Sequence, residues 1–148
     1  MLEQLQETKT NYYEEIKEKL LKSEIYDRVK DYEKNQNKVK VYFEIGKLLH
    51  DAGKEYGKNI IGEYSNRLTI EVGKKYNERN LRYMRKFYEL FEGQIWNTLC
   101  SKLSWSHYRE GLSLENINEI KYYLDECQSK NLTVRELQDI IKEIKETN

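Results

Sequence analysis

The chain has 148 residues, a length that suits one domain with a single hydrophobic core. Its 26 Lys and Arg residues balance its 26 Asp and Glu residues, so the net charge gives no argument for a polyanionic partner. The sequence contains no proline, and 35% of its residues are charged. This composition favours an all-α bundle whose helices carry solvated charges.

Several functional classes find no support in the composition. No stretch approaches the length of apolar sequence that spans a bilayer, and the N-terminus MLEQLQETK lacks the apolar core of a signal peptide. We therefore expect a cytoplasmic protein that has no membrane contact. Cys100 and Cys127 are too few for a disulfide framework or a zinc site and are expected to be reduced thiols. No metal or cofactor is expected.

Residues 1–38 predict an N-terminal helical arm. The apolar period along it is disturbed near Ser23, and Asn35–Asn37 is a second weak point. Because little else covers the apolar seam, the arm either folds back on the chain or pairs with a second copy, and we expect a homodimer. The seam consists of Leu2, Leu5, Tyr12, Tyr13, Ile16, Leu20 and Leu21.

Residues 39–148 predict the main helical domain. Its first helix starts at Val39 and is expected to end at His50–Gly53, before a loop at Lys54–Asn59. Gly46 falls on the inward stripe of this helix. Glycine there costs about 1 kcal/mol relative to alanine, which indicates the close approach of another helix.

A helix-turn-helix-like pair is predicted at about residues 60–91. The first helix is expected to stop at Gly73 in a left-handed conformation. The second, which we call the reader helix, covers Asn77–Phe91 and begins with Asn77 as its N-cap. Two helices joined by a short glycine-containing turn are typical of a helix-turn-helix. The apolar stripe of the reader helix is Leu81, Met84, Phe87, Tyr88 and Phe91.

The opposite side of the reader helix is basic. Six basic residues lie between Lys74 and Lys86, against one acid. Arg79 and Arg82 are suited to guanine edges and the lysines to phosphates. Solvated charge on a helix face is the alternative explanation. Asn80 could read adenine, but it falls near the apolar stripe and could equally form a buried hydrogen bond. The predicted DNA-binding residues are Lys74, Lys75, Arg79, Arg82, Tyr83 and Lys86.

The remaining sequence predicts further short helices. One covers Ile95–Leu103, and the last begins with a capping box made by Thr133 and Glu136. Ser104 or Ser106 is a candidate cap for a helix whose inner stripe is Trp105, Tyr108 and Leu112. Ser113 is the candidate cap of the helix that contains Ile117, Ile120, Tyr123, Leu124 and Cys127.

Ser104, Ser106 and His107 lie close together in the sequence, as serine and histidine do in a hydrolase site. A nucleophile needs a base within hydrogen-bond reach and a third group that orients the base. Neighbours on a helix do not point at one another. We therefore expect His107 to serve packing, His50 to sit at a helix C-terminus, and the protein not to be an enzyme.

Five stretches together resemble one bacterial and phage family. FEIGKLL, YGKNIIGEYSNRL, ERNLRYMRKFY, LSWSHYREGL and LTVRELQ are similar to the N-terminal domain of the YhcG-like proteins, over about Val39 to Ile141. In that family a DNA-binding helix-turn-helix domain usually precedes a PDDEXK-type nuclease domain. The resemblance implies that Arg79, Asn80, Leu81, Tyr83 and Met84 belong to the reader motif. Trp105, His107, Tyr108 and Arg109 match a second motif of the family. Together with Asn77 and Asn80, they are expected to serve the structure of the domain.

Because the sequence ends at Asn148, soon after the helical domain, we expect no nuclease fold in this chain, which would be a departure from that family. Its Glu-x-Lys triplets, Glu119–Lys121 and Glu143–Lys145, fall on predicted helices, whereas nuclease chemistry needs them on a strand beside a second acid. We therefore expect a non-catalytic protein of a phage or mobile element that binds double-stranded DNA.

Two other roles stay open. The chain could be an adaptor that supplies DNA binding to a separately encoded nuclease. It could also be a protein-interaction module, an inhibitor or assembly partner, that uses its 13 tyrosines and its acidic tail and binds no nucleic acid.

Overall fold

A computed structural model describes residues 11–29, 34–94 and 103–147, without the side chains of residues 26–29, 34–36 and 94. These residues form seven α-helices and one short 3-10 helix, and no strand occurs among them, which confirms the all-α prediction. The elements are α2 (Tyr12–Val29), α3 (Lys34–Tyr56), α4 (Ile60–Glu71), α5 (Glu78–Phe91), η1 (Glu92–Gln94), α7 (Trp105–Gly111), α8 (Ile117–Lys130) and α9 (Val134–Thr147).

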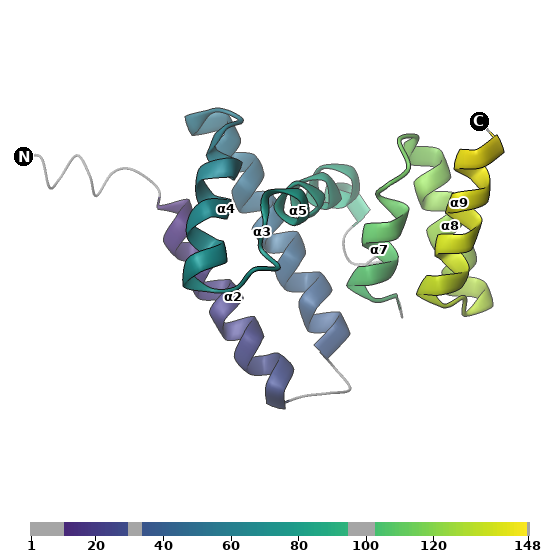
Figure 1. Cartoon of the computed structure of the whole chain (residues 1–148), viewed down its shortest axis with the longest axis horizontal. Coiled ribbons are helices and arrows are strands. Elements are labelled where there is room, and N and C mark those ends of the chain that lie inside the picture. Colours follow the sequence, from purple (N-terminus) through teal and green to yellow (C-terminus); the bar gives the residue numbers. More distant parts are fainter. Residues whose placement is uncertain (1–10, 30–33, 95–102, 148) are drawn as a thin grey trace, which may run out of the picture.

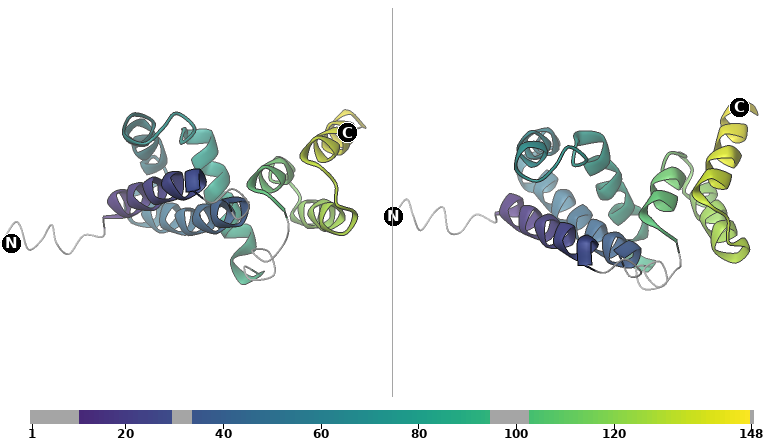
Figure 2. Two further views of the ribbon diagram at one scale, coloured as in Figure 1. Left: turned by 90° about the horizontal axis from the view of Figure 1, so that it is seen from below. Right: turned by 60° about the horizontal axis from the view of Figure 1, so that its bottom comes forward.

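The helices form two neighbouring groups: the first group is α2 to α5, and the second group is α7 to α9. Figure 1 shows α2 to α5 together, with α7 placed between α5 and the pair α8 and α9, and both views of Figure 2 keep this order. The groups share one core. The Phe87 ring of α5 lies 5.4 Å from the Trp105 ring and 4.9 Å from the Tyr108 ring, measured between centroids. The aromatic contacts therefore join α5 to α7.

The N-terminal arm folds back on the chain. Tyr13, Ile16 and Leu20 of α2 are buried in the common core, and α2 continues through the buried Ser23 without the predicted disturbance. Leu2 and Leu5 lie outside the described residues. The boundary that the sequence placed at residue 38 falls inside α3.

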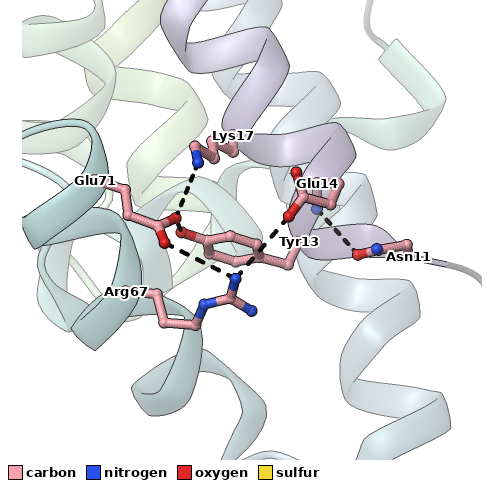
Figure 3. A network of polar contacts seen from close by, with 6 residues as sticks. All are labelled: Asn11, Tyr13, Glu14, Lys17, Arg67 and Glu71. Atoms are coloured by element: carbon pink, nitrogen blue, oxygen red, sulfur yellow. Dashed lines mark hydrogen bonds and ion pairs between the residues drawn. The ribbon is translucent and has the colours of Figure 1, made fainter.

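Polar contacts fasten α2 to α4. The Tyr13 hydroxyl donates a hydrogen bond to Glu71, whose carboxylate also lies 3.3 Å from Lys17 Nζ. The Arg67 guanidinium covers the Tyr13 ring at 3.7 Å from its centroid (Figure 3). Burial, followed by the hydrogen bond to Glu71, raises the pKa of Tyr13, so the hydroxyl stays a donor.

Helix α3 is longer than predicted at both ends. It begins at Lys34, so Asn35–Asn37 is helical, and it continues to Tyr56, so the predicted end at His50–Gly53 is wrong. The reason is packing: Ala52 is fully buried, and burial outweighs the turn preference of its neighbours. The helix is followed instead by Gly57, whose φ of 93° suits glycine.

The end of α4 also differs from the prediction. Gly73 does not adopt a positive φ. The N–H groups of Val72 and Gly73 both donate to Leu68 O, at 2.8 and 3.0 Å. Tyr76 closes the turn that follows. Its N–H donates to Gly73 O at 3.2 Å, and its ring is buried. The hydrogen bonds of the turn and the Tyr76 anchor therefore replace the expected left-handed glycine.

The caps of the later helices are mostly as predicted. Ser104 is the N-cap of α7, and the Thr133–Glu136 capping box is present, with Glu136 N–H donating to Thr133 Oγ1 at 3.1 Å. Ser113 does not cap α8. Asn116 does so by accepting Asn118 N–H at 2.8 Å, while the Ser113 hydroxyl turns back to Glu110 O because α8 begins later than predicted. The predicted helix over Ile95–Leu103 falls largely outside the described residues.

Candidate nucleic-acid interface

The reader helix is α5, and it begins as the sequence predicts. Asn77 has an extended backbone, and its Oδ1 accepts Asn80 N–H at 2.9 Å, which confirms it as the N-cap. The predicted apolar stripe faces the core, with Tyr88 half-buried. Its fully packed members are Leu81, Met84, Phe87 and Phe91.

Gly46 sets how closely α5 approaches α3. A Cβ atom built on Gly46 would lie 2.1 Å from Met84 O and 2.8 Å from Tyr88 Cβ, so only glycine fits. The predicted close approach at Gly46 is confirmed, and the partner is the reader helix. Because the backbone of α5 is pressed on α3 there, its basic side faces away from the core.

The turn before α5 is held by α2. Lys75 Nζ lies 2.6 Å from Glu24 Oε1, and the buried Tyr76 hydroxyl donates to the same carboxylate. Burial acts to raise the pKa of Glu24, but the hydrogen bonds from Lys75 and Tyr76 outweigh it and lower that pKa. Burial raises the pKa of Tyr76. Glu24 therefore stays ionised and offsets the charge of Lys75.

Asn80 takes the structural role that the sequence left open. Its side-chain amide donates to Lys75 O at 2.6 Å, and its Oδ1 is buried without a hydrogen-bond partner among the described residues. The side chain thus stabilises the turn, and it does not project with the exposed basic residues.

Of the predicted DNA-binding residues that lie on α5, Arg82 and Lys86 have polar partners within the protein. Arg82 Nη2 lies 2.6 Å from Glu78 Oε1, one helical turn away. Lys86 Nζ donates to Leu112 O at 2.6 Å and to Leu114 O at 3.1 Å, where α7 ends. With Lys75 held by Glu24, Lys74 and Arg79 are the cations of this set that have neither an ion pair nor a hydrogen bond within the described part of the chain.

Tyr83 has two guanidinium groups near its ring. The Cζ atoms of Arg79 and Arg109 are each 5.9 Å from the centroid of its ring, at the outer limit of a cation–π contact. Arg109 comes from α7 and was expected to belong to the structural motif. The fold therefore adds a cation from the second helical group to the basic side of α5.

Two hollows adjoin Arg79 and Tyr83. One has a volume of about 500 Å³ and is lined by the outward side chains of α5, from Glu78 to Lys86. The other, of about 380 Å³, lies where α5, α7 and α9 meet, and we call it the interhelical groove. Its charged lining residues are Arg79, Arg109, Lys142, Lys145, Glu110 and Glu146.

Sequence reasoning missed Lys142 and Lys145. They stand three residues apart on the polar side of an amphipathic helix, a pattern that is usually solvated surface. Nothing in the local pattern indicates that α9 lies opposite α5. The one available signal is the predicted length and order of the helices, which does not fix how the groups pack.

His107 belongs to a closed hydrogen-bond network. Its Nδ1 lies 2.9 Å from Ser104 Oγ and accepts Ser104 N–H at 3.2 Å, while its Nε2 faces Leu132 O at 2.9 Å. A nitrogen that faces a carbonyl carries the proton, so Nε2 donates and Nδ1 accepts. The network caps α7 and ties it to the loop before α9, which supports the packing role expected for His107.

The other candidate chemical groups are also engaged or buried. His50 lies inside α3, not at its end, and its Nδ1 is 2.7 Å from Glu89 Oε2, so the predicted helix-terminal placement is wrong. Burial raises the pKa of Cys127 and keeps it a thiol; Cys100 lies outside the described residues. Within the described ranges, no cluster of three His, Cys, Asp or Glu side chains could hold a metal, and no helix is long and apolar enough to cross a bilayer.

The comparisons with known proteins identify the family. The model of the DUF1016 N-terminal domain matches residues 3–145. The chain belongs to this family. The match agrees with the resemblance to the YhcG-like N-terminal domain. No curated protein matched the chain, and no solved structure did.

The extent of the match bears on the N-terminal helix. The resemblance drawn from the motifs begins at about Val39, whereas the DUF1016 N-terminal domain begins at residue 3 and includes α2. Both helical groups, from α2 to α9, thus lie within the family domain almost completely. The residues around Tyr83 come from both groups, so they lie on surfaces of one family domain.

Proposed function

We propose that this DUF1016 N-terminal domain binds double-stranded DNA, with α5 as the reader helix and α4 as its support. The observation that carries the proposal is the orientation of α5. Gly46 and the buried stripe press one side of the helix on α3, so Arg79 and Arg82 project from its first turns. The N-terminal residues of a recognition helix are those that reach base edges in the major groove.

The partners of the cations on and before α5 separate those that are available to DNA from those that stabilise the fold. Arg79 is exposed and has no ion pair among the described residues, so its donors are available to an external acceptor. Arg82 forms an exposed ion pair with Glu78, and such a pair is weak enough to exchange for a nucleic-acid contact. Lys74 precedes the helix and suits a phosphate. Lys75 and Lys86 serve the fold in this arrangement.

We propose a binding role without catalysis, and a homodimer as the binding form. The Ser104 hydroxyl accepts His107 N–H, and His107 Nδ1 accepts Ser104 N–H, so both groups of this pair are engaged in capping α7. A dimer would bring two reader helices to one duplex. Leu21 and Ile25 on the outer side of α2 are 40% and 61% exposed, and they offer an apolar surface for a second copy.

Fluorescence anisotropy with a mixed-sequence duplex over a salt series tests the proposal. We expect an affinity that falls steeply with salt, because neutralised phosphates release counterions. Replacing Arg79 and Arg82 with alanine should abolish binding. The matched control replaces Lys54, in the last turn of α3, and Lys58, in the turn that follows; both are exposed, and their loss should leave binding nearly intact. Weak binding that ignores both salt and the arginines would contradict the proposal.

A second candidate is a protein-interaction module. The observation that favours it is Ile70 of α4, which is 87% exposed, together with Tyr122 of α8, which is 58% exposed. Such a partner could be a separately encoded nuclease that uses the domain as an adaptor. Copurification of one stoichiometric protein, disrupted by Ile70→Asp and untouched by Arg79→Ala, would favour this candidate.

A further inference from the structure

We infer that the DNA-binding surface crosses the interhelical groove, so that Arg109 of α7 and Lys142 and Lys145 of α9 contact backbone phosphates beside the reader helix. The inference rests on the proposed DNA-binding function of α5. It adds a second set of contacts that comes from a different helical group.

Arg109 is the residue that joins the two sets. It is half-buried, its guanidinium lies 5.9 Å from the Tyr83 ring, and it has no ion pair within the described ranges. Arg79 stands at the same distance from that ring. An aromatic contact restrains a guanidinium without using its N–H donors, so both groups keep their forked donors for an external oxyanion.

The lining of the interhelical groove is positive. Four cations and two carboxylates line it, and one of the carboxylates, Glu110, already accepts the Gln138 amide at 3.0 Å. The positive charge of Arg79 therefore continues from α5 across the interhelical groove to Arg109, Lys142 and Lys145.

Helix α9 presents its lysines from a fixed position. Ile141 is 4% exposed and anchors the helix in the core, while Lys142 and Lys145 are exposed beside it. Neither lysine has an ion pair within the part of the chain that the structure describes. Exposed lysines at the rim of a groove are suited to act as point charges for phosphates.

The geometry of a duplex explains why the phosphates would lie there. A helix of about 10 to 12 Å diameter fills a major groove of about 12 Å, so the two sugar–phosphate strands run along its flanks. The interhelical groove is one flank of α5. A strand on that side would pass between Arg79 and the cations of α7 and α9.

Two variants test the inference with the same duplex: Arg109→Ala, and Lys142→Ala combined with Lys145→Ala. We expect each to weaken binding about fivefold to twentyfold and to lower the salt slope by about one for each cation removed. Arg135→Ala, at the other end of α9, is the matched control for Arg109 and should change neither quantity. Lys54→Ala with Lys58→Ala is the control for the lysine pair.

The possible outcomes separate the inference from the proposed function. If Arg79→Ala with Arg82→Ala abolishes binding while the new variants keep the affinity and salt slope of the unaltered chain, the inference is wrong and the function of α5 stands. If none of the variants matters, both are wrong. Tight binding to a single strand but not to a duplex would also overturn the inference. Should Arg109→Ala fail to fold, the exposed lysine pair decides the question alone.

Discussion

Gly46 of α3 and Met84 of α5 meet backbone to backbone, because a Cβ atom at Gly46 would lie only 2.1 Å from Met84 O. Gly46→Ala should therefore destabilise the domain by about 1 to 3 kcal/mol, since overpacking outweighs the gain of about 1 kcal/mol in helix propensity. Urea denaturation measures the change in the free energy of unfolding.

The same helix supplies the control for Gly46. Gly53 is also helical, and a Cβ built there meets no atom within 4 Å. Gly53→Ala should stabilise the domain by about 0.5 to 1 kcal/mol. If the two alanine variants were equally stable, α3 and α5 would have to lie farther apart than described.

Glu71 should make the domain sensitive to acid. The hydrogen bond from Tyr13 lowers its pKa below the ordinary value of 4.5, against the effect of burial and with help from Lys17. Because the folded state holds this proton less tightly than the unfolded state, the contribution is complete above about pH 5 and is lost as the pH falls through the folded-state pKa.

Glu71→Gln should lower stability near neutral pH and flatten the loss of stability on the acid side. Unfolding free energies measured between about pH 3 and about pH 7 would show both effects. Glu63→Gln, an exposed change on the same helix, is the control. An acid limb that is unchanged by Glu71→Gln would contradict the description of the contact with Tyr13.

Lys86 should contribute to stability more than to DNA binding. Lys86→Met keeps the aliphatic stem but removes the donor to Leu112 O and Leu114 O. Leaving these carbonyls unpaired should cost about 1 to 3 kcal/mol in denaturation experiments. At temperatures where the variant is folded, the salt slope of DNA binding should fall less than it does for Arg79→Ala. An equal fall in the salt slope would show that Lys86 contacts a phosphate.

His107 should behave as a structural residue. His107→Ala removes the bond to Leu132 O and the acceptor of Ser104 N–H, and we expect a loss of about 1 to 3 kcal/mol in the free energy of unfolding. Ser106→Ala in the same turn is exposed and should change stability by less than about 0.5 kcal/mol. Equal stability of the two variants would rule out the capping network.

Local signals in the sequence predict most of the fold. The caps at Asn77 and Thr133 and the glycine at position 46 each depend on residues that are close in the chain or on an unusual residue in a stripe. The end of α3 was missed because the burial of Ala52 depends on tertiary packing, which outweighs turn propensity.

The candidate site was less predictable because its charges are partitioned by long-range contacts. Lys75 meets Glu24 from 51 residues earlier in the chain, and Lys86 meets Leu112 from 26 residues later. Arg109 reaches Tyr83 through the packing of two helical groups. Periodicity shows which side of α5 is polar, but it cannot show which cations are already neutralised.

The carboxylate of Glu24 has a consequence for mapping the domain by truncation. A fragment that begins at Val39 would keep every predicted reader residue and lose Glu24. Its buried Tyr76 hydroxyl would lose the Glu24 carboxylate, and the charge of Lys75 would no longer be offset, so the fragment would be both less stable and more basic than the whole chain. Nonspecific binding of DNA by such a fragment would reflect Lys75 without its ion pair. A loss of sequence selectivity would reflect a less stable turn before α5.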